Sequence, residues 1–496
     1  QAYRGRLRAL PRNPMESGLF YEKSQIKIDR LIWHHDGRVA ITILTFQEGT
    51  VPESFVVVCG PPDVIAEEQQ RYRVHASKAF GSSNTILSGQ AETTHYAAIT
   101  YSLAGVDVEH VQAFADLYQN GSEKRFNTAL DHLFQQTLTA WHQATSFRAD
   151  AQKLDELYRE RFNWASRGIT QEVLNDRMKV LVRQVPTLGC NISYNAKQIT
   201  IRFRDHERSY PNPVSLLYNI PDSGHPLLVI NTPGYLSGDN ILVDANHQTW
   251  LTDFSASGLA PLLWNFVTLE AAIRFDQIDT NNLQALNEME QCLVESELGR
   301  LNIQDVDTSL RKPAKAIRAI RQHALHEAGK DSLPHHIGML FQAMNRLVDF
   351  NPALHPTVNE LVRFTHLLIA AAMIAGKIEQ AGQTKTGGAM TAEIGIRIDQ
   401  DNGAVRVDGR QAHVTGQSFI LLAYLYEHAG QRCTKRDLIE EVFNIPYREG
   451  DESQVGRLNT AIRRLREKIE EEPSRPRYIL TATSGGYRLA LDPTSG

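Results

Sequence analysis

Residues 453–472, SQVGRLNTAIRRLREKIEEE, decide the fold of the C-terminal part of this 496-residue chain. Their apolar residues recur at helical spacing, so one face of this helix must pack on a core. From residue 453 to 468 there are five basic residues and one acid, whereas the region from 394 onward holds 15 of each sign. The positive charge of this region is therefore concentrated on one helix. The core-facing positions are Leu458, Ile462, Leu465 and Ile469.

Shorter elements surround this helix. Residues 394–407 alternate apolar and polar side chains around an Asp-Asn-Gly turn, which predicts a β-hairpin. A helix follows with Thr415 as its cap and Gly430 as its stop, and a second helix opens at Thr434 with a capping-box arrangement. Residues 478–491 predict a further hairpin around Ser-Gly-Gly. The order of parts is sheet, helix, helix, basic helix and hairpin.

That order is typical of a winged helix, and three segments make the resemblance specific. VDGRQAHVTGQSFILLAYLYEHAGQRCTKRDLIEEVF (407–443), LNTAIRRLREKIEEEP (458–473) and YILTATSGGYRL (478–489) resemble the OmpR/PhoB-type response-regulator effector domain. The resemblance implies that the basic helix enters the major groove of double-stranded DNA, and that the last hairpin, the wing, touches the adjacent minor groove or phosphates. Where the family's wing commonly carries a basic residue, this chain has Thr483 and Ser484. The residues expected to contact DNA are Arg457, Thr460, Arg463, Arg464, Arg466, Lys468 and Arg488.

A run of charge by itself is more typical of a solvated helix face than of a DNA-binding surface. The order of the surrounding elements outweighs that alternative here. In the resembled family the loop before the basic helix can meet RNA polymerase, and residues 444–452 occupy that position. Repeated half-sites would place two copies on one DNA, so a dimer on DNA is expected.

The N-terminal part begins with a β-rich region. Residues 26–46 contain two apolar runs around an Asp-Gly turn, and residues 54–60, SFVVVCG, form a third run. A helix is predicted over 63–80, with Glu68 on its apolar face. Three strands followed by a helix are typical of the small lobe of a nucleotide kinase.

Residues 225–258, HPLLVINTPGYLSGDNILVDANHQTWLTDFSASG, discriminate best between folds for this part. Two short apolar strands, 241–243 and 249–251, flank a turn, with Asn240 before the first strand and Asp253 after the second. The hairpin therefore brings an amide oxygen and a carboxylate to one end, and oxygen ligands of this kind suit Mg²⁺. We predict that Asn240 and Asp253 bind a metal and a nucleotide cofactor. The alternative is an ordinary hairpin with polar ends.

The same segment resembles the active-site segment of aminoglycoside-phosphotransferase-like and choline-kinase-like enzymes, where H-G-D-L-x-x-x-N-I-L-V-D precedes a strand ending in I-D-F. A similar module occurs as the ternary complex associated domain of bacterial signalling proteins. The resemblance implies a metal-binding role for Asn240 and Asp253. Pro233 stands where the pattern has His, Tyr235 where it has the catalytic Asp, and Val58 where the phosphate-pairing Lys is expected.

These departures bear on catalysis. Phosphoryl transfer needs a Lys that holds the phosphates, a metal that bridges them and an Asp that orients the hydroxyl. Tyr235, whose phenol ordinarily has a pKa of about 10, cannot replace that Asp at neutral pH. Glu68 matches the ion-pair partner of the missing Lys and is expected to lack a partner. We therefore predict no catalytic residue and a pseudokinase that senses a ligand, such as a nucleotide or phosphate compound, or a partner.

Two alternatives to this sensor stay open. One is an active small-molecule phosphotransferase tethered to DNA, and the other is a scaffold that only binds partner proteins. The predicted fold class is α+β and multidomain, with a degenerate two-lobed kinase-like domain followed by a winged helix-turn-helix. The expected parts are a basic arm or linker at 1–24, the kinase-like domain at 25–378 with its small lobe ending near 105, a linker at 379–393 and the winged helix at 394–492.

Composition excludes several classes of protein. Hydrophobic residues make up 42% and charged residues 22%, as in ordinary globular proteins, which excludes wholesale disorder and collagen-like chains. The four cysteines have no C-x-x-C pairing, so neither a disulfide framework nor a zinc site is expected. The longest apolar stretch, 367–375, is too short for a membrane span. We expect a cytoplasmic regulator, and further residues upstream because the chain begins with Gln1.

Overall fold

The protein is described here by a computed structural model. It covers residues 20–490 apart from gaps at 21–22, 24, 49–52, 80–84, 104–110, 140, 142–146, 149–153, 204–205, 221–227, 329–331, 352–355, 388–394, 400–403, 409, 413, 415–416, 444, 449 and 483–484. The predicted arm before residue 20, Thr415, Thr483 and Ser484 lie outside the described residues. The chain divides into two compact units, one of Gln1–Pro221 with Pro226–Ala381 and one that includes Gly382–Gly496.

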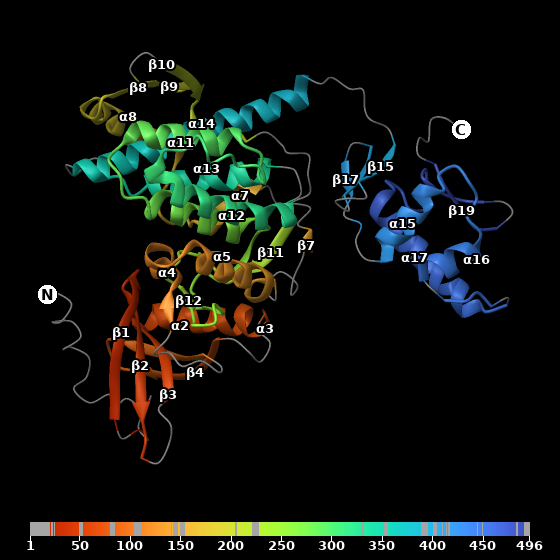
Figure 1. The fold of residues 1–496 in the computed structure, drawn as a ribbon, viewed down its shortest axis with the longest axis horizontal. Coiled ribbons are helices and arrows are strands. Elements are labelled where there is room, and N and C mark those ends of the chain that lie inside the picture. Colours follow the sequence, from red (N-terminus) through yellow and green to blue (C-terminus); the bar gives the residue numbers. More distant parts are fainter. Residues whose placement is uncertain are drawn as a thin grey trace. The chain divides into compact units, whose positions relative to one another are not determined.

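The small lobe of the first unit is an antiparallel sheet with a helical segment packed on it (Figure 1). Its elements are β1 (Gln25–His35), β2 (Arg38–Phe46), β3 (Glu53–Gly60), α2 (Pro62–Arg71), the π-helical turn η2 (Tyr72–Ala76), α3 (Ser77–Ala79), β4 (Thr85–Glu92) and β5 (Ala97–Leu103). The strand order is β1-β2-β3-β5-β4, and α2 packs against β3 and β5. Asp36 and Gly37 turn between β1 and β2 with positive φ, as the Asp-Gly signal predicts. The three predicted strands and the helix after them are confirmed.

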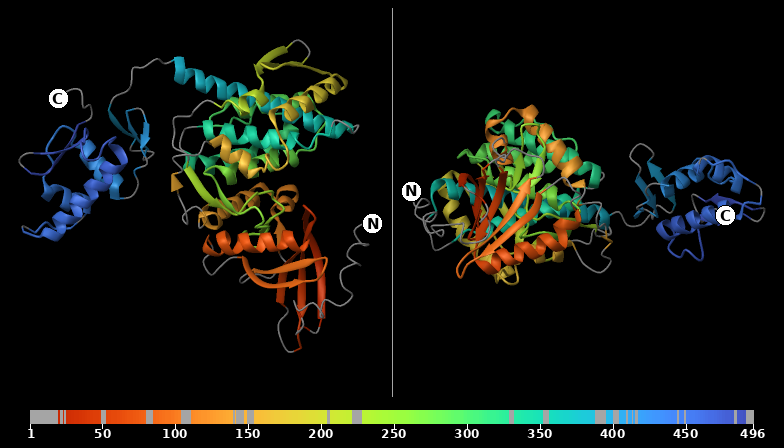
Figure 2. Two further views of the ribbon diagram at one scale, coloured as in Figure 1. Left: turned by 180° about the vertical axis from the view of Figure 1, so that it is seen from behind. Right: turned by 90° about the horizontal axis from the view of Figure 1, so that it is seen from below.

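The large lobe is mainly helical and lies beyond the sheet in the same unit (Figure 2). Its first elements are β6 (Gln112–Ala113), α4 (Phe114–Asn120), α5 (Glu123–His132), η4 (Leu133–Thr137), β7 (Phe147–Arg148), α7 (Leu154–Arg161), α8 (Gln171–Gln184), η5 (Val185–Leu188), β8 (Cys190–Tyr194), β9 (Gln198–Phe203), β10 (His206–Pro211) and α9 (Pro213–Leu217). Strands β8, β9 and β10 form a three-stranded sheet in the order β10-β9-β8.

The rest of this lobe contains the predicted hairpin and a group of packed helices. Its elements are β11 (Leu228–Thr232), β12 (Ile241–Val243), β13 (Thr249–Leu251), β14 (Gly258–Pro261), α10 (Trp264–Ala271), η6 (Ala272–Asp276), α11 (Leu283–Glu295), η7 (Thr308–Leu310), α12 (Arg311–Ala328), α13 (Leu333–Leu347) and α14 (Val358–Gly387). The hairpin strands β12 and β13 pair as expected, and β6 extends their sheet. The described elements thus follow the predicted order of a small β lobe and a helical lobe.

The apolar stretch at 367–375 belongs to α14. The helix is longer than that stretch. Its part Val358–Gly382 is long and apolar enough to cross a membrane, with a mean hydropathy of 1.6. However, 83% of its most apolar window is buried inside the protein, which is the behaviour of a core helix. Helix α14 also continues to Gly387, so it covers the start of the linker expected at 379–393. Its Glu, Gln and Lys residues favour helix there.

Buried ionic groups join the helices of the large lobe. They are Glu270, Arg274, Glu290, Arg321, His335 and His366 from α10, η6, α11, α12, α13 and α14. Arg321 Nη2 lies 2.7 Å from Glu270 Oε1, and His366 Nε2 lies 2.8 Å from Glu290 Oε1. Burial alone would raise the pKa of both carboxyls, but the arginines outweigh it and lower the pKa of Glu290 to about 2. Six elements therefore share one paired network, which is costly to break on one side only.

The second unit has the parts of a winged helix in the predicted order. They are β15 (Ile396–Asp399), β16 (Ala404–Val407), β17 (Arg410–Ala412), α15 (Gln417–Glu427), α16 (Lys435–Asp437), η8 (Leu438–Val442), α17 (Glu452–Ile469), β18 (Ile479–Thr481) and β19 (Tyr487–Leu489). The capping box of Thr434 and Asp437 is present, and Gly430 has a φ of 78° just after α15. The predicted core positions of α17, Leu458, Ile462, Leu465 and Ile469, are all buried.

The wing is fastened to the rest of this unit at two places. Glu470, which is 8% exposed, accepts hydrogen bonds from the backbone N–H groups of Arg477, Tyr478 and Ile479. On the other strand, the backbone groups of Tyr487 and Cys433 bond each other at 2.9 Å. A Cβ on Gly486 would lie 2.2 Å from the carbonyl oxygen of Cys433, so this close approach requires glycine.

Gly486→Ala should therefore destabilise the winged-helix unit by roughly 2–4 kcal/mol, because the methyl group clashes and the φ of 93° disfavours a side chain. Hydrogen exchange of the backbone amides of this unit in the full chain measures the effect. Gly456→Ala is the control, since a Cβ there meets open space in a helix. Equal protection of the two variants would contradict the role given to Gly486.

Candidate functional site

The hairpin brings the predicted metal-binding residues to the same end of β12 and β13. The backbone N–H of Thr252 donates to the carbonyl of Asn240 at 2.9 Å, so Asp253 follows directly on the residue paired with Asn240. Both side chains are largely buried, at 4% exposure for Asn240 and 11% for the side chain of Asp253. Their polar atoms, however, have different partners.

Asp253 is bound by cations from the small lobe. Nη1 of Arg38, at the start of β2, lies 2.6 Å from Oδ1 of Asp253 and 2.7 Å from Oε2 of Glu68. Nε2 of His35 lies 3.1 Å from Oδ2 of Asp253. The expectation that Glu68 lacks a partner was wrong. Val58 on β3 carries no charge, and the guanidinium of Arg38 on β2 pairs with Glu68 instead. We call Arg38, His35, Glu68 and Asp253 the ionic cluster.

The surroundings hold the ionic cluster in place. The Tyr101 hydroxyl donates to Oε1 of Glu68 at 3.0 Å, and the guanidinium of Arg38 lies 5.2 Å from the ring centroid of Trp33. A Cβ on Gly60, at the end of β3, would lie 2.9 Å from Cγ of Arg38, so the absence of a side chain there makes room for the arginine. Arg38 is 2% exposed and Glu68 is fully buried.

The cluster shifts the pKa values of its members in opposite directions. Burial, followed by the charge of Asp253, raises the pKa of Glu68 to about 7 against the effect of Arg38. Burial would also raise the pKa of Asp253, but His35 and Arg38 outweigh it and hold that pKa well below its ordinary value. For His35 burial works downward, and the hydrogen bonds to Asp253 and Asp36 raise its pKa to about 9. At neutral pH, His35 and Arg38 are therefore cations opposite an ionised Asp253.

The predicted metal ligands do not fit a metal in this arrangement. Oδ1 of Asn240 accepts from the backbone N–H of Ser237 at 3.1 Å, and its Nδ2 donates to the carbonyl of Tyr235. Oδ1 of Asp253 accepts from Arg38 and from the hydroxyl of Ser255. Among the described residues, no group of three His, Cys, Asp or Glu side chains could hold a metal ion. The metal- and cofactor-binding role of Asn240 and Asp253 stays a prediction.

Tyr235 stands where a catalytic Asp is expected and is engaged in the protein. Its hydroxyl donates to the carbonyl oxygen of Arg161 at 2.8 Å, and burial raises its pKa to about 12. A phenol with that pKa does not accept a proton at neutral pH. Asp239, four residues further on, has an exposed side chain, and partial desolvation of its carboxyl, followed by the charge of Asp116, raises its pKa.

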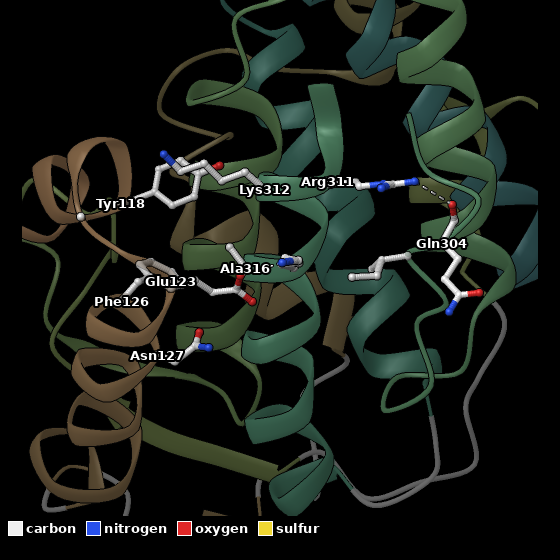
Figure 3. Close-up of a pocket in the computed structure, with 11 residues that line it drawn as sticks. Tyr118, Glu123, Phe126, Asn127, Gln304, Arg311, Lys312 and Ala316 are labelled. Atoms are coloured by element: carbon white, nitrogen blue, oxygen red, sulfur yellow. Dashed lines mark hydrogen bonds and ion pairs between the residues drawn. The ribbon is translucent and has the colours of Figure 1, made fainter. Parts of the chain in front are cut away.

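A pocket of about 720 Å³ lies elsewhere in the large lobe, between α5 and α12 (Figure 3). Its lining is Tyr118, Gly121, Glu123, Phe126, Asn127, Ile303, Gln304, Arg311, Lys312, Lys315 and Ala316. The cations have partners within the protein: Lys315 lies 2.7 Å from Glu123, and Lys312 donates to the carbonyl of Gln119. None of these residues belongs to the predicted site.

The predicted DNA-binding face of α17 is largely exposed. Arg457, Thr460, Arg463, Arg464 and Lys468 are exposed, and so is Arg488 on β19. Arg466 differs from them, because its guanidinium donates to the carbonyl of Ile479 at 2.6 Å and lies over the ring of Tyr487. It therefore joins the helix to the wing. The described residues of the loop before α17 are also held, since Nε2 of Gln454 donates to the carbonyl of Pro446 at 3.1 Å.

Comparison with known proteins bears on the second unit. Residues 409–489 match the family described as "Transcriptional regulatory protein, C terminal". This unit is a transcriptional-regulator domain of the OmpR/PhoB type. The match confirms the resemblance predicted from the sequence. It covers this domain alone, and the rest of the chain lies outside it.

Three solved structures are similar to parts of the chain. DrrB of Thermotoga maritima, an OmpR/PhoB homologue, is 32% identical over 19% of this chain and 41% of its own, with a TM-score of 0.17, so this chain spans about two fifths of that protein's length. The RstA DNA-binding domain of Klebsiella pneumoniae, solved with the RstA box, is 29% identical over 19% and 91%, with a TM-score of 0.18. A thermostable mutant of the aminoglycoside phosphotransferase APH(4)-Ia is 10% identical over 74% and 97%, with a TM-score of 0.35.

Sequence reasoning missed Arg38 and His35 as members of the site. The signal for Arg38 was that a charged residue begins the strand RVAITILTF, whose other residues are mostly apolar and buried. A buried cation at such a position requires a carboxylate partner. The cation that pairs with Glu68 comes from β2, the strand next to β3.

The stability of the first unit should fall between pH 7 and 9.5. The folded-state pKa of His35 is raised from 6.5 to about 9, so its contribution is fully present below about pH 6.5 and is lost as the pH rises through 9. Urea unfolding of the full chain across this range, read by a probe in the first unit, measures the slope. His35→Gln should flatten the slope, whereas exposed His95→Gln should keep it; an unchanged slope in His35→Gln would remove His35 as the cause.

Proposed function

We propose that the chain is a cytoplasmic DNA-binding transcription regulator in which a pseudokinase module controls a winged helix. The observation that carries the regulator function is the family match of residues 409–489. It is supported by the exposed basic residues on α17, which extend over the face opposite the buried core positions. Phosphate contacts by such residues position a protein on double-stranded DNA, and a helix in the major groove reads its bases.

Contact with RNA polymerase and dimerisation on DNA belong to the same proposal. The described part of the loop before α17 is held to neighbouring helices on both sides. Besides the contact to Gln454, the backbone N–H of Tyr447 donates to Oε1 of Glu440 at 3.1 Å, and the guanidinium of Arg436 lies 5.5 Å from the ring centroid of Tyr447. A loop with a fixed shape suits a protein partner, because less entropy is lost on binding.

The ionic cluster supports a pseudokinase. The carboxylate that would hold a metal is already neutralised by Arg38 and His35, and the position of the catalytic carboxylate is occupied by Tyr235, a phenol with a raised pKa. Transfer therefore lacks both the metal bridge and the group that orients the acceptor hydroxyl. A ligand controls such a module only by binding one arrangement better than the other. The ligand would have to replace Arg38 or His35 at Asp253.

The DNA-binding function is tested by replacing two groups of arginines on α17 in separate variants. Arg463→Ala with Arg464→Ala should weaken binding to a selected operator by about 1–3 kcal/mol for each base-contacting arginine. Arg466→Ala should instead lower the stability of the winged-helix unit, because it removes the bonds to Ile479. Binding titrations at several salt concentrations measure the first effect. Wild-type affinity of the double variant at every salt concentration would defeat the DNA-binding face proposed here.

The pseudokinase proposal is tested with nucleotide on the full chain. Turnover of ATP with aminoglycoside or choline acceptors should equal that of buffer. Under the sensor function, Mg-ADP at 100 times its dissociation constant stabilises the fold by about 2.7 kcal/mol. Asp253→Ala should abolish that thermal shift, and exposed Asp176→Ala should keep it. Absence of any shift at millimolar nucleotide would favour the scaffold alternative, and turnover that is lost in Tyr235→Phe would favour the phosphotransferase.

A further inference from the structure

A second cluster of basic side chains lies against residues 256–258, the segment that follows Asp253 and Phe254. Arg161, at the end of α7, donates from Nη2 to the carbonyl of Ala256 at 2.6 Å. Arg71, at the end of α2, donates from Nη1 to the carbonyl of Ser257 at 3.2 Å. A Cβ on Gly258 would lie 3.4 Å from Nη1 of Arg161 and 3.7 Å from Nε2 of His75. Three basic side chains from three elements thus converge on consecutive backbone positions.

Arg161 is a cation without a carboxylate. Among the residues that the structure describes, its polar partner is the Ala256 carbonyl, its guanidinium lies 4.8 Å from the ring centroid of Trp264, and its buried Nε has no hydrogen-bond partner. Burial lowers the pKa of Arg161 to about 10 against the opposite effect of Tyr235, and the charge of Arg71 adds a smaller lowering effect. Buried arginines are ordinarily paired with an anion, because desolvation of an unpaired charge is costly. In the same unit Arg38, Arg274 and Arg321 all follow that rule.

The place beside Gly258 is suited to the missing anion. Glycine leaves open the space that a side chain would fill beside Arg161 and His75, and its φ of 150° is a conformation that other residues rarely adopt. Arg71 connects the place to solvent, since its side chain is 38% exposed and pairs with Glu67 through the atoms that do not reach Ser257. The cluster therefore has two guanidinium groups and one carboxylate, on its outer side.

We infer that Arg161, Arg71 and His75 form a binding site for a phosphate-type oxyanion beside Gly258. Guanidinium groups bind the oxygens of phosphate through short, charge-assisted hydrogen bonds, and a tetrahedral anion can accept from three directions at once. The anion would come from a free phosphate compound or from a phosphorylated Ser255 in the adjoining segment, since Ser257 is fully buried.

Such a site connects two parts of the ionic cluster. Arg71 lies one turn beyond Glu68 on α2, and the segment 254–258 begins directly after Asp253. An anion held between Arg71 and Arg161 would fix the end of the helix against that segment. It would thereby fix the distance between the two carboxylates that Arg38 joins. The inference does not depend on nucleotide binding at Asp253.

Inorganic phosphate is the probe, added to phosphatase-treated full chain at constant ionic strength. Phosphate should raise the melting temperature saturably, and Arg161→Met should weaken that binding by about tenfold or more, as loss of a charge-assisted pair predicts. Without phosphate, Arg161→Met should melt no lower than wild type, because it removes an unpaired buried cation. Arg300→Met, at a side chain that is 82% exposed, is the matched control and should bind phosphate like wild type.

Arg71→Gln provides a second variant, and it should also weaken phosphate binding. Intact mass and peptide mapping before phosphatase treatment distinguish the sources: an unmodified chain supports a free phosphate compound, and a phosphate on Ser255 supports a covalent one. No phosphate-dependent shift, or equal shifts in wild type, Arg161→Met and Arg71→Gln, would overturn the inference.

Discussion

The position of Arg38 between Glu68 and Asp253 is the constraint on which the first unit depends. The two carboxylates come from a helix of the small lobe and from the hairpin of the large lobe, and both are mostly withdrawn from water. Burial disfavours the charged form of both, and Arg38 is the cation that the two carboxylates share. The cation therefore fixes the sheet, α2 and the segment after β13 relative to one another. It also determines what chemistry Asp253 has left to offer.

Local patterns in the sequence were sufficient for the winged-helix elements, for the first strands and the helix of the small lobe, and for the buried face of α17. The apolar runs in 26–46, the capping box at Thr434 and the helical spacing in α17 depend on neighbours along the chain, and the structure has all of them. The partner of Glu68 could not be found in this way. Whether a cation reaches Glu68 from β2 or from β3 depends on strand order, on the space beside Gly60 and on the length of an arginine. Those are properties of packing, which spacing along the chain does not encode.

The position of Arg466 in the second unit also depends on packing and not on local sequence pattern alone. Helical periodicity puts it beside the exposed face with Arg463 and Arg464, and by charge alone the three are equivalent. The structure separates them, because β18 presents the carbonyl of Ile479 at the place where Arg466 ends. A long side chain at the border of a helix face serves whichever surface supplies an acceptor. Its role is therefore settled by the wing, about a dozen residues further along the chain.

The ionic cluster and the basic cluster at Arg161 place opposite demands on a ligand. At Asp253 the protein supplies the cations itself, so an incoming metal or nucleotide must replace contacts of 2.6 and 3.1 Å and gains only the difference. At Arg161 the described part of the chain supplies a cation and no carboxylate, so an anion gains the full pairing without displacing one. The free energy gained by a ligand is therefore larger at Arg161 than at Asp253. Because the short segment 254–258 connects them, a ligand at Arg161 would bear directly on whether Arg38 keeps its place at Asp253.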